Sequence, residues 1–567
     1  MNWDYIVVGA GSAGCVLANR LSADPRVRVL LLEAGGSDKR FNIMMPALAF
    51  KAMADGRTNW KFMTEPDPTR NNRRDMMPRG KVLGGSSSIN AMFYVRGNRG
   101  DYDHWAQLGN RGWSYDDILP FFKKVEGNRD GVSDIYGKNG PVVVGAVRKP
   151  PKLAYVFLEA MKELGYPHNA AYNAEPTDGA AIVHVTQHMG IRFSAARGYL
   201  DPIKRRPNLR IITGALVRRI MFEGRRAVGV EFEISGKAQV ERCGREVIVS
   251  ASAVNSPKLL MLSGIGPAAE LRAHGIGVLQ DSPGVGQNLQ EHASTQVKAL
   301  VNVKTANQEF NLLGKLKYGT QFLLDRSGYA TYTYTGVALV RTRPELEYPD
   351  VQYHFGAFSA NYTHGGVEMQ KEAAVNLQPN VNASRSRGYL GLRSADPREQ
   401  PKIQLNLLSD RYDIETLMAG GRIARAALMS NAFAPYVTGE LKPGKDVQTD
   451  DEWTAYMREN ASGSYHPCGT CKMGIDPAAV VTPELKVIGV VGLRVIDSSI
   501  IPQIPSANLN AISMAIGEKG AELVLKDLAK LAQPDGRHDR QGDETLTAES
   551  EASPAPPGQI SVAAMSS

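Results

Sequence analysis

Several features that would assign the protein to a class are scarce in this 567-residue sequence. It has only four cysteines, Cys15, Cys243, Cys468 and Cys471, too few for the disulfide framework of a small secreted domain. The N-terminus lacks the basic and apolar regions of a secretory signal, and no run of eighteen or more apolar residues predicts a transmembrane helix. We therefore expect a cytoplasmic protein, with peripheral contact at the inner face of the membrane as an open alternative.

Charge of one sign is also in short supply. The sequence has 66 basic and 58 acidic residues, a net charge of +8. The basic residues form only short clusters, such as 204–206, and are not interleaved with aromatic residues as on nucleic-acid-binding surfaces. We interpret them as solvated surface and expect no nucleic-acid partner. A peripheral membrane patch remains the functional alternative.

The chain is too long for one ordinary domain, so two domains are expected. The pattern of apolar and polar residues changes near residue 296. Beyond it, short stretches in which apolar and polar residues alternate, such as 351–355, predict antiparallel strands. A helical pattern from Asp413 to Met429 lies among them. From Gln533 onward the composition is rich in Asp, Glu, Ser and Pro, which predicts disorder.

The N-terminus carries a glycine-rich motif in a specific context. Strand-like residues 4–8 precede Gly9-Ala10-Gly11-Ser12-Ala13-Gly14, a helix pattern runs from Ser12 to Leu21, and a second strand, 27–32, ends at Glu33. In such a βαβ unit the first two glycines allow a tight turn and close approach to a pyrophosphate, and the third allows close packing of helix on strand. The helix N-terminus supplies free N–H groups for the phosphates.

Glu33 is placed to accept hydrogen bonds from ribose hydroxyls, and it disfavours NADP because a carboxylate repels a 2′-phosphate. The motif alone leaves FAD and NAD open.

Further elements are expected along the chain. A helix is predicted over 113–126, and strands over 209–213 and 227–232 around a turn at Glu223–Arg225. Strand 246–251 leads into another helix, residues 491–497 predict a strand, and Asn510 to Ala529 predicts a terminal helix. The glycine-rich residues 72–103 are expected to form extended loop.

Two further motifs identify a family. Residues 80–103 begin Gly80-Lys81-Val82-Leu83-Gly84-Gly85-Ser86-Ser87-Ser88-Ile89-Asn90, and residues 252–266 run from Ser252-Ala253-Val254-Asn255-Ser256-Pro257 to Gly264-Ile265-Gly266. Both stretches resemble the signature patterns of the glucose–methanol–choline (GMC) oxidoreductase family. The resemblance extends to about residue 530 and is greatest to the choline dehydrogenase-like and alcohol dehydrogenase-like branch.

The resemblance implies an α/β fold: a Rossmann-type FAD-binding domain of the glutathione-reductase type and a substrate domain on an antiparallel sheet. The implied FAD domain is discontinuous, and its three segments are 1–155, 195–295 and 456–531. The substrate domain takes 156–194 with 296–455, and a disordered tail takes 532–567.

The resemblance also implies a set of cofactor contacts. These residues are Gly9, Gly11, Ser12, Ala13, Gly14, Glu33, Ala34, Gly80, Gly84, Gly85, Ser86, Asn90, Ala91, Met92, Phe93, Val217, Ala251, Tyr465, Asp497, Ser498, Ala511 and Ile512. Some family members link the flavin covalently through a histidine at the position that matches Ile89. Isoleucine cannot form that bond, so we expect non-covalent FAD.

Residues 464–474 resemble the family block that carries a histidine facing the flavin, and residues 493–510 resemble the terminal block. Carried over, the catalytic pair is His466 and Asn510. A histidine titrates near neutral pH and can take the hydroxyl proton of an alcohol, while the asparagine orients the substrate oxygen. Many relatives have Asn-Ala-Pro where this chain has Asn510-Ala511-Ile512, which puts the placement of Asn510 in question.

Cys468-Gly469-Thr470-Cys471 is a C-x-x-C sequence, which occurs in redox dithiols and zinc sites. A second C-x-x-C is lacking, so four-cysteine zinc is excluded by count. We interpret the two thiols as packed in the interior and expect no metal.

The leading hypothesis is an FAD-dependent dehydrogenase that oxidises a primary alcohol to the aldehyde and passes electrons to a quinone or another acceptor. An oxidase that uses oxygen and forms hydrogen peroxide is the nearest alternative. A light-driven decarboxylase or a lyase on the same fold, and a non-enzymatic flavin-binding or membrane-associated protein, are further alternatives. The identity of the alcohol and the oligomeric state stay open.

Overall fold

In the computed structural model, residues 3–131, 134–309, 311–363 and 366–532 are described. The residues up to Leu525 form one compact unit, and Lys526 begins a second one. The tail expected over 532–567 lies outside the described residues except for Ala532. Within the described chain, no helix is both long enough and apolar enough to span a bilayer.

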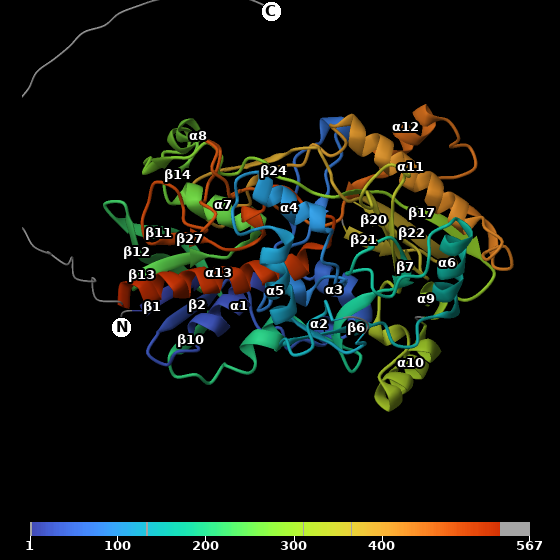
Figure 1. Cartoon of the computed structure of the whole chain (residues 1–567), viewed down its shortest axis with the longest axis horizontal. Helices are drawn as coiled ribbons and strands as arrows, with labels where there is room; N and C mark the ends of the chain where they lie inside the picture. Colours follow the sequence, from blue (N-terminus) through green and yellow to red (C-terminus); the bar gives the residue numbers. More distant parts are fainter. Residues whose placement is uncertain (1–2, 132–133, 310, 364–365, 533–567) are drawn as a thin grey trace, which may run out of the picture. The chain divides into compact units, whose positions relative to one another are not determined.

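The first sheet is built around the N-terminal βαβ unit (Figure 1). Its strands are β1 (Trp3–Val8), β2 (Val29–Glu33), β10 (Leu209–Thr213), β11 (Ala215–Glu223), β12 (Arg226–Ile234), β13 (Lys237–Val249) and β27 (Leu493–Val495). Strands β10, β2, β1, β13 and β27 run parallel in this order. The carboxyl ends of neighbouring parallel strands therefore meet at one edge, where α/β folds bind their ligands.

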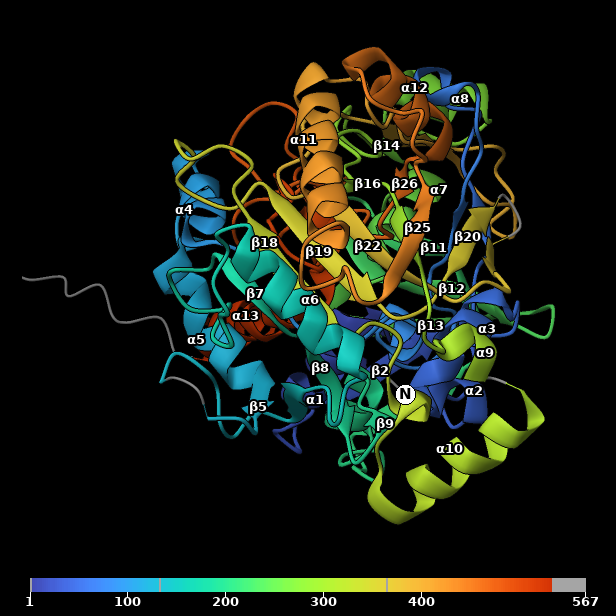
Figure 2. The ribbon, with the colours of Figure 1, turned by 90° about the vertical axis from the view of Figure 1, so that its right-hand side faces the viewer.

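The second sheet is antiparallel and lies beside the first (Figures 1 and 2). It comprises β7 (Gly179–Ile182), β16 (Ala293–Ser294), β17 (Val297–Val301), β18 (Gly336–Val340), β19 (Val351–Gly356), β22 (Ala374–Val381), β25 (Val437–Lys442) and β26 (Ser462–Gly463). The predicted fold class, a parallel dinucleotide-binding sheet with a separate antiparallel sheet, is confirmed. The segment boundaries of the two domains stay a prediction.

Helices cover both sheets. They are α1 (Ser12–Leu21), α2 (Phe41–Met44), α3 (Ala49–Ala54), α4 (Arg99–Gln107), α5 (Tyr115–Val125), α6 (Lys152–Glu163), α7 (Ser252–Leu262), α8 (Ala268–Ala273), α9 (Ala306–Glu309), α10 (Leu312–Asp325), α11 (Arg411–Leu428), α12 (Asp450–Asn460) and α13 (Leu509–Ala532). Short helical turns are η1 (Pro46–Leu48), η2 (Pro68–Arg70), η3 (Gly85–Ser88), η4 (Ala196–Leu200), η5 (Tyr329–Thr331) and η6 (Ser498–Ile500).

Small sheets complete the connections. Their strands are β3 (Phe62–Met63), β4 (Met76–Met77), β5 (Glu126–Asn128), β6 (Val142–Ala146), β8 (His184–His188), β9 (Ile191–Arg192), β14 (Ile265–Gly266), β15 (Gln280–Asp281), β20 (Ala360–Thr363), β21 (Gly366–Met369), β23 (Tyr389–Gly391) and β24 (Lys402–Gln404).

Two expectations about local structure were wrong. The hairpin over Gly224 joins β11 to β12, whereas residues 209–213 form β10 and run parallel to β2. The stretch 72–103 is not all loop, because α4 begins at Arg99. A capping box explains this start: the Asn98 and Asp101 side chains each bond the other's backbone N–H, which satisfies two of the orphan donors of a helix start.

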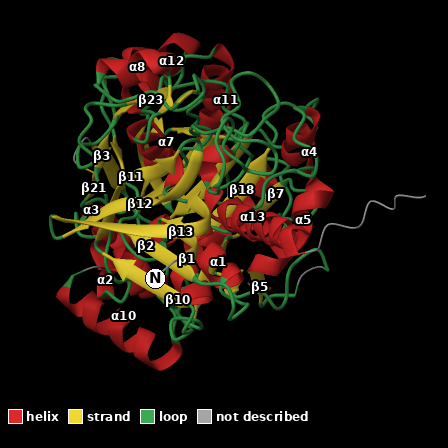
Figure 3. Cartoon of the chain, turned by 90° about the vertical axis from the view of Figure 1, so that its left-hand side faces the viewer, coloured by secondary structure: helices red, strands yellow, loops and turns green. Residues whose placement is uncertain are grey.

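The terminal helix α13 packs against α1, as the left-hand face in Figure 3 shows. Gly517 makes this contact close: a β-carbon there would lie 2.9 Å from Val16 Cβ and 3.0 Å from Ala13 Cα. The Arg20 guanidinium forms an ion pair at 2.7 Å with Glu518 beside it. This packing of α13 on α1 holds the last described helix against the N-terminal βαβ unit.

This contact yields a prediction. Gly517→Ala should lower the free energy of unfolding by about 1–3 kcal/mol, the usual cost of overpacking a filled interior, as measured by chemical denaturation. Gly319→Ala is the matched control, because it is also a helical glycine but a β-carbon there meets nothing within 4 Å. The control should gain up to about 1 kcal/mol from helix propensity. Equal stability of the two variants would contradict the close contact.

Candidate active site

Two glycine turns approach each other at the carboxyl edge of the first sheet. Gly9 has a φ of +99°, and a β-carbon there would lie 2.4 Å from Ser250 O. Gly85 has a φ of +53°, and its β-carbon would lie 2.7 Å from Gly11 Cα. Backbone in the left-handed region that must also contact backbone requires glycine.

The start of α1 is open to a ligand. Gly11 is its N-cap and provides no side-chain hydrogen bond, so the first N–H groups of the helix point towards the cavity with the positive end of the helix dipole. A β-carbon at Gly14 would lie 1.9 Å from Gly9 O. These features fit the pyrophosphate of a dinucleotide such as FAD.

Glu33 ends β2 at this edge of the sheet. Its carboxylate accepts the N–H groups of Ala10 at 2.9 Å and Gly35 at 2.7 Å. Burial raises its pKa to about 7, although the two N–H donors oppose the shift. The backbone bonds hold the carboxyl group in place and leave lone pairs for a further donor.

Asp497, which follows β27, is also a buried carboxylate that accepts several hydrogen bonds. It accepts the N–H of Ser252 at 2.8 Å, the Ser256 hydroxyl at 2.6 Å and the Ser499 hydroxyl at 2.6 Å. Burial raises its pKa. Asp497 therefore joins the start of α7 to the start of η6, and both turns face the same cavity.

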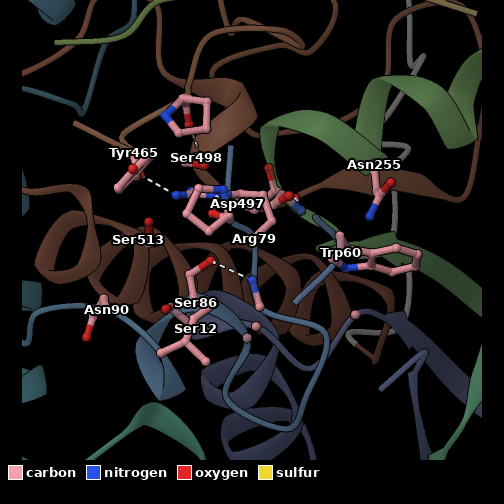
Figure 4. Close-up of a pocket in the computed structure, with 18 of the residues that line it drawn as sticks. Ser12, Trp60, Arg79, Ser86, Asn90, Asn255, Tyr465, Asp497, Ser498 and Ser513 are labelled. Carbon is pink, nitrogen blue, oxygen red and sulfur yellow. Dashed lines mark hydrogen bonds between the residues drawn. The ribbon is translucent and has the colours of Figure 1, made fainter. Parts of the chain in front are cut away.

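One cavity gathers most of the predicted cofactor residues. Those that line it are Gly9, Gly11, Ser12, Ala13, Glu33, Ala34, Gly80, Gly85, Ser86, Asn90, Ala91, Met92, Phe93, Val217, Ala251, Tyr465, Asp497 and Ser498. Figure 4 shows Ser12, Ser86 and Asn90 on one side of this space and Tyr465 and Ser498 on the other. Gly14, Gly84, Ala511 and Ile512 are not among the lining residues.

His466 also lines this cavity, and its neighbours fix its tautomer. His292 Nε2 lies 3.1 Å from the carbonyl oxygen of Pro505, which can only accept, so Nε2 carries the proton. His292 Nδ1 is then an acceptor, and His466 Nδ1, 2.9 Å away, donates to it. The remaining nitrogen, His466 Nε2, carries a lone pair.

Burial keeps both rings neutral. It lowers the pKa of His292 to about 4. The pKa of His466 falls well below its ordinary value, first through burial and then through the nearby His292, His354 and Arg79. An unprotonated imidazole nitrogen is thus available at neutral pH.

The structure corrects the partner of this histidine. Asn508, not Asn510, lies against His466, with Nδ2 at 3.1 Å from Nε2. Asn510 Oδ1 instead accepts the Ser12 hydroxyl at 2.8 Å. Asn508 precedes α13, whereas Asn510 sits in its first turn, and the two side chains bind different partners, His466 and Ser12.

Several residues at this end escaped the sequence analysis. Gln352 Nε2 donates to Asn508 Oδ1 at 2.8 Å and to His354 Nε2 at 2.8 Å, which orients the Asn508 amide towards His466. His354 packs on Phe93, with ring centroids 4.4 Å apart. The alternation of 351–355 predicted a strand, but which residues of that strand face a cavity depends on pairing far along the chain.

A buried carboxyl supports the histidine backbone. Glu291 Oε1 accepts the N–H of His466 at 2.6 Å and that of His292 at 3.0 Å. Burial raises the Glu291 pKa to about 7. Arg79 donates to the carbonyl of Tyr465, and burial lowers its pKa to about 10.

Cys468 and Cys471 follow His466 and are free and fully buried. Burial raises the pKa of both thiols, which disfavours the reactive thiolate. Within the described residues, no group of three or more His, Cys, Asp or Glu side chains could hold a metal ion.

The fold and the cavity together define an α/β protein built to hold a dinucleotide beside an unprotonated histidine nitrogen. Two GMC oxidoreductase family models match the chain, the N-terminal one over residues 3–294 and the C-terminal one over 384–517. The chain belongs to the GMC oxidoreductase family. It is an FAD-dependent oxidoreductase that acts on an alcohol.

Named relatives agree with this assignment. The chain is 44% identical to the oxygen-dependent choline dehydrogenase of Brucella canis over 93% of its own length and 96% of the relative's. The corresponding protein of Rhizobium meliloti is also 44% identical, with the same coverage.

Solved structures share the fold. A pyridoxine 4-oxidase from Mesorbium loti is 30% identical, with a TM-score of 0.83 over 92% of this chain and 99% of that one. A formate oxidase is 26% identical, with a TM-score of 0.87 over 94% and 99% of the two chains.

The glycine cradle yields a prediction. Gly85→Ala should purify with less than about a tenth of the wild-type FAD, because a β-carbon would push the turn away from Gly11 and disturb the phosphate cradle. The flavin-to-protein absorbance ratio measures this. Gly36→Ala is the matched control in a neighbouring turn, since a β-carbon there meets nothing within 4 Å. Full FAD content in Gly85→Ala would contradict the cradle.

Proposed function

We propose that the alcohol binds at the end of the cavity lined by His466 and Asn508 and that His466 Nε2 takes its hydroxyl proton. The observation that carries this proposal is the hydrogen-bond chain from Pro505 through His292 to His466, which leaves Nε2 unprotonated and able to accept a proton. When bound, FAD supplies the acceptor for the hydride that leaves the alcohol carbon.

Asn508 acts as the orienting partner in this proposal. Its Nδ2 group now donates to His466 Nε2, and an alcohol that enters between them can donate to Nε2 while its oxygen accepts from the amide. Gln352 keeps the amide turned the required way through its bond to Oδ1. Asn510, bonded to Ser12, belongs in this proposal to the cofactor side.

We further propose non-covalent FAD, because Ile89 lines the cavity with an aliphatic side chain that cannot form a bond to the flavin. Electrons pass to a quinone or another organic acceptor. Oxygen is the second candidate, since the curated relatives are named oxygen-dependent and the similar structures include oxidases. Four free, buried cysteines support a cytoplasmic location.

The proposed substrate is a neutral primary alcohol. Among the described residues that line the cavity, the carboxylates are Glu33 and Asp497, and both already accept backbone N–H groups at the dinucleotide edge. The lining near His466 includes the neutral groups Phe93, Tyr334 and Gln378 and the cationic Arg79, which would repel a positively charged substrate. A quaternary ammonium favours a carboxylate or an aromatic cage, so choline is the second candidate, on the strength of the relatives' names.

Substitutions test the proposed base. In His466→Ala, alcohol-driven flavin reduction under anaerobic conditions should slow by about 10²- to 10⁴-fold while FAD is retained, because general-base catalysis is lost. Asn508→Ala should slow it by about 10²-fold or more. Asn510→Ala is the control and should affect FAD retention more than the reduction rate. Normal reduction in Asn508→Ala with loss in Asn510→Ala would contradict the assignment.

The pH dependence provides a second readout of the same base. Only the neutral form of His466 can accept a proton, and burial lowers its pKa, so the neutral form persists as the pH falls through 6.5. The rate of flavin reduction in the wild type should therefore stay level down to this pH and decline only below it. A decline centred above pH 7 would indicate a different base.

A screen of alcohols tests the substrate proposal. With an artificial electron acceptor, the holoenzyme should oxidise neutral aliphatic or aromatic primary alcohols with a kcat/KM at least about tenfold above that for choline, because the cavity provides no carboxylate at this end. Reoxidation of the reduced enzyme by air and by a quinone analogue, measured in parallel, separates the two acceptors. A clear preference for choline would overturn the neutral-substrate proposal and leave the base intact.

A further inference from the structure

Helix α10 exposes an unusual amount of apolar surface. Leu312 is 76% exposed, Leu313 77%, Leu316 64%, Leu323 70% and Leu324 82%. Figures 1 and 2 show the helix at the periphery of the ribbon, away from both sheets. Single exposed leucines are ordinary in proteins, but five on one short helix form a contiguous patch that indicates an interaction site.

The five leucines form one stripe. With about 100° of rotation per residue, they occupy an arc of about 120° on the helix. The residues buried from α10 are Gly314, Tyr318 and Phe322, which lie about 180° from the centre of that arc by the same rotation. The helix is therefore anchored on one side and presents leucines on the opposite side, which we call the leucine stripe.

The buried side anchors α10 firmly. Tyr318 packs on Tyr329 with ring centroids 5.0 Å apart, and the Arg326 guanidinium lies 4.7 Å from the Phe322 ring centroid. A β-carbon at Gly190, in the turn between β8 and β9, would lie 3.0 Å from Phe322. The preceding residue in that turn, Met189, is itself 49% exposed and adds apolar surface beside the helix.

Lysines border the stripe. Lys315 and Lys317 are exposed. At the same rotation per residue, Lys317 lies about 20° beyond one edge of the stripe and Lys315 about 60° beyond the other. The acidic Asp325 near the helix end is paired with Lys149 at 2.6 Å. An apolar stripe between basic residues is the arrangement of helices that lie in the interface of an anionic bilayer, where the lysine stems extend their charges towards the headgroups.

We propose that the leucine stripe of α10 docks the enzyme on an anionic phospholipid surface. The charge pattern favours a bilayer over a second copy of this chain. A two-fold contact through the stripe would place the bordering lysines of one copy beside those of the other, whereas phosphate headgroups would neutralise them. The proposal concerns binding and does not depend on the alcohol reaction.

The same helix is connected to the substrate end of the cavity. Tyr329, which contacts Tyr318, packs on Tyr332 at 5.6 Å between ring centroids. Tyr332 belongs to the apolar cluster that also contains Tyr334 and Phe93, both of which line the cavity. Docking through α10 would thus bring this side of the enzyme to the bilayer, where apolar alcohols and quinones dissolve.

Vesicle binding tests the proposal. The holoenzyme should co-sediment with vesicles of equal parts phosphatidylglycerol and phosphatidylcholine, and much less with phosphatidylcholine alone. The triple substitution Leu313→Ser, Leu316→Ser and Leu323→Ser should weaken binding by about tenfold or more. The matched control replaces three exposed apolar residues elsewhere, Val240→Ser, Ile475→Ser and Val491→Ser, and should bind as the wild type does.

FAD content and thermal unfolding show whether each variant is folded. The proposal is overturned by wild-type protein that ignores anionic vesicles or by a leucine variant that binds equally well. It is likewise overturned by a wild-type dimer that the leucine substitutions dissociate while vesicles have no effect, since the stripe would then be a contact between copies.

A probe experiment keeps the test independent of the triple variant. All four native cysteines are buried, so a single Leu316→Cys can be labelled selectively with an environment-sensitive fluorophore. On addition of anionic vesicles its emission should shift to the blue, whereas the same label on Ile475→Cys should not shift. An unchanged emission at position 316, or an equal shift at both positions, would contradict docking through the stripe.

Discussion

The active site depends on the approach of backbone to backbone at the carboxyl edge of the parallel sheet. A β-carbon at Gly9 would lie 2.4 Å from Ser250 O, and one at Gly85 would lie 2.7 Å from Gly11 Cα. These two contacts bring together three segments of the chain: the N-terminal turn at Gly9 and Gly11, the turn at Gly85, and Ser250 just after the end of β13. Side chains could not converge so closely, and it is the resulting exposure of N–H groups that creates a place for phosphates.

From that edge the cavity extends to a second set of constraints, which concern protons. The Pro505 carbonyl accepts a hydrogen bond from His292 Nε2, so His292 Nδ1 is unprotonated. His292 Nδ1 in turn accepts from His466 Nδ1, so His466 Nε2 keeps a lone pair. The chain of bonds works because burial disfavours the charged form of each ring. The Pro505 carbonyl, which takes no part in the proposed reaction, thereby determines which nitrogen of His466 is unprotonated.

The sequence was most informative where function requires local motifs. The glycines at 9–14, the turn around Gly85 and the histidine block at 464–474 each specify their structure within a few residues, so their positions could be predicted. The partner of His466 could not be fixed in the same way. Asn508 and Asn510 are two residues apart in one motif, and only the start of α13 at Leu509 decides which amide turns towards His466 and which towards Ser12.

His292 and Gln352 escaped the sequence analysis for a related reason. Each lies beside the cavity through long-range pairing: β16, just after His292, pairs with β26, and β19 carries Gln352 next to β22. Neither residue stands in a pattern that distinguishes it from an ordinary buried polar group, and no local signal could have identified it. The exposed leucines of α10 were also missed. They follow the period of an amphipathic helix, and that period does not show whether the apolar side of a helix faces the core or solvent.

The cavity near His466 and the surface of α10 both lack an unpaired carboxylate among their described residues: Arg79 is the charged residue that lines the cavity there, and Asp325 of α10 is paired with Lys149. Inside the cavity, an unpaired charge would be costly to bury. The carboxylates among its described lining residues, Glu33 and Asp497, lie at the dinucleotide edge, where backbone N–H groups satisfy them. A substrate that brings its own positive charge would then have no partner beside the base, whereas an uncharged alcohol loses little on leaving water or lipid. If the substrate is an uncharged alcohol, as proposed, it concentrates at a lipid surface, and the proposed docking of α10 would place the enzyme there through exposed leucines that enter the lipid and lysines that meet its headgroups.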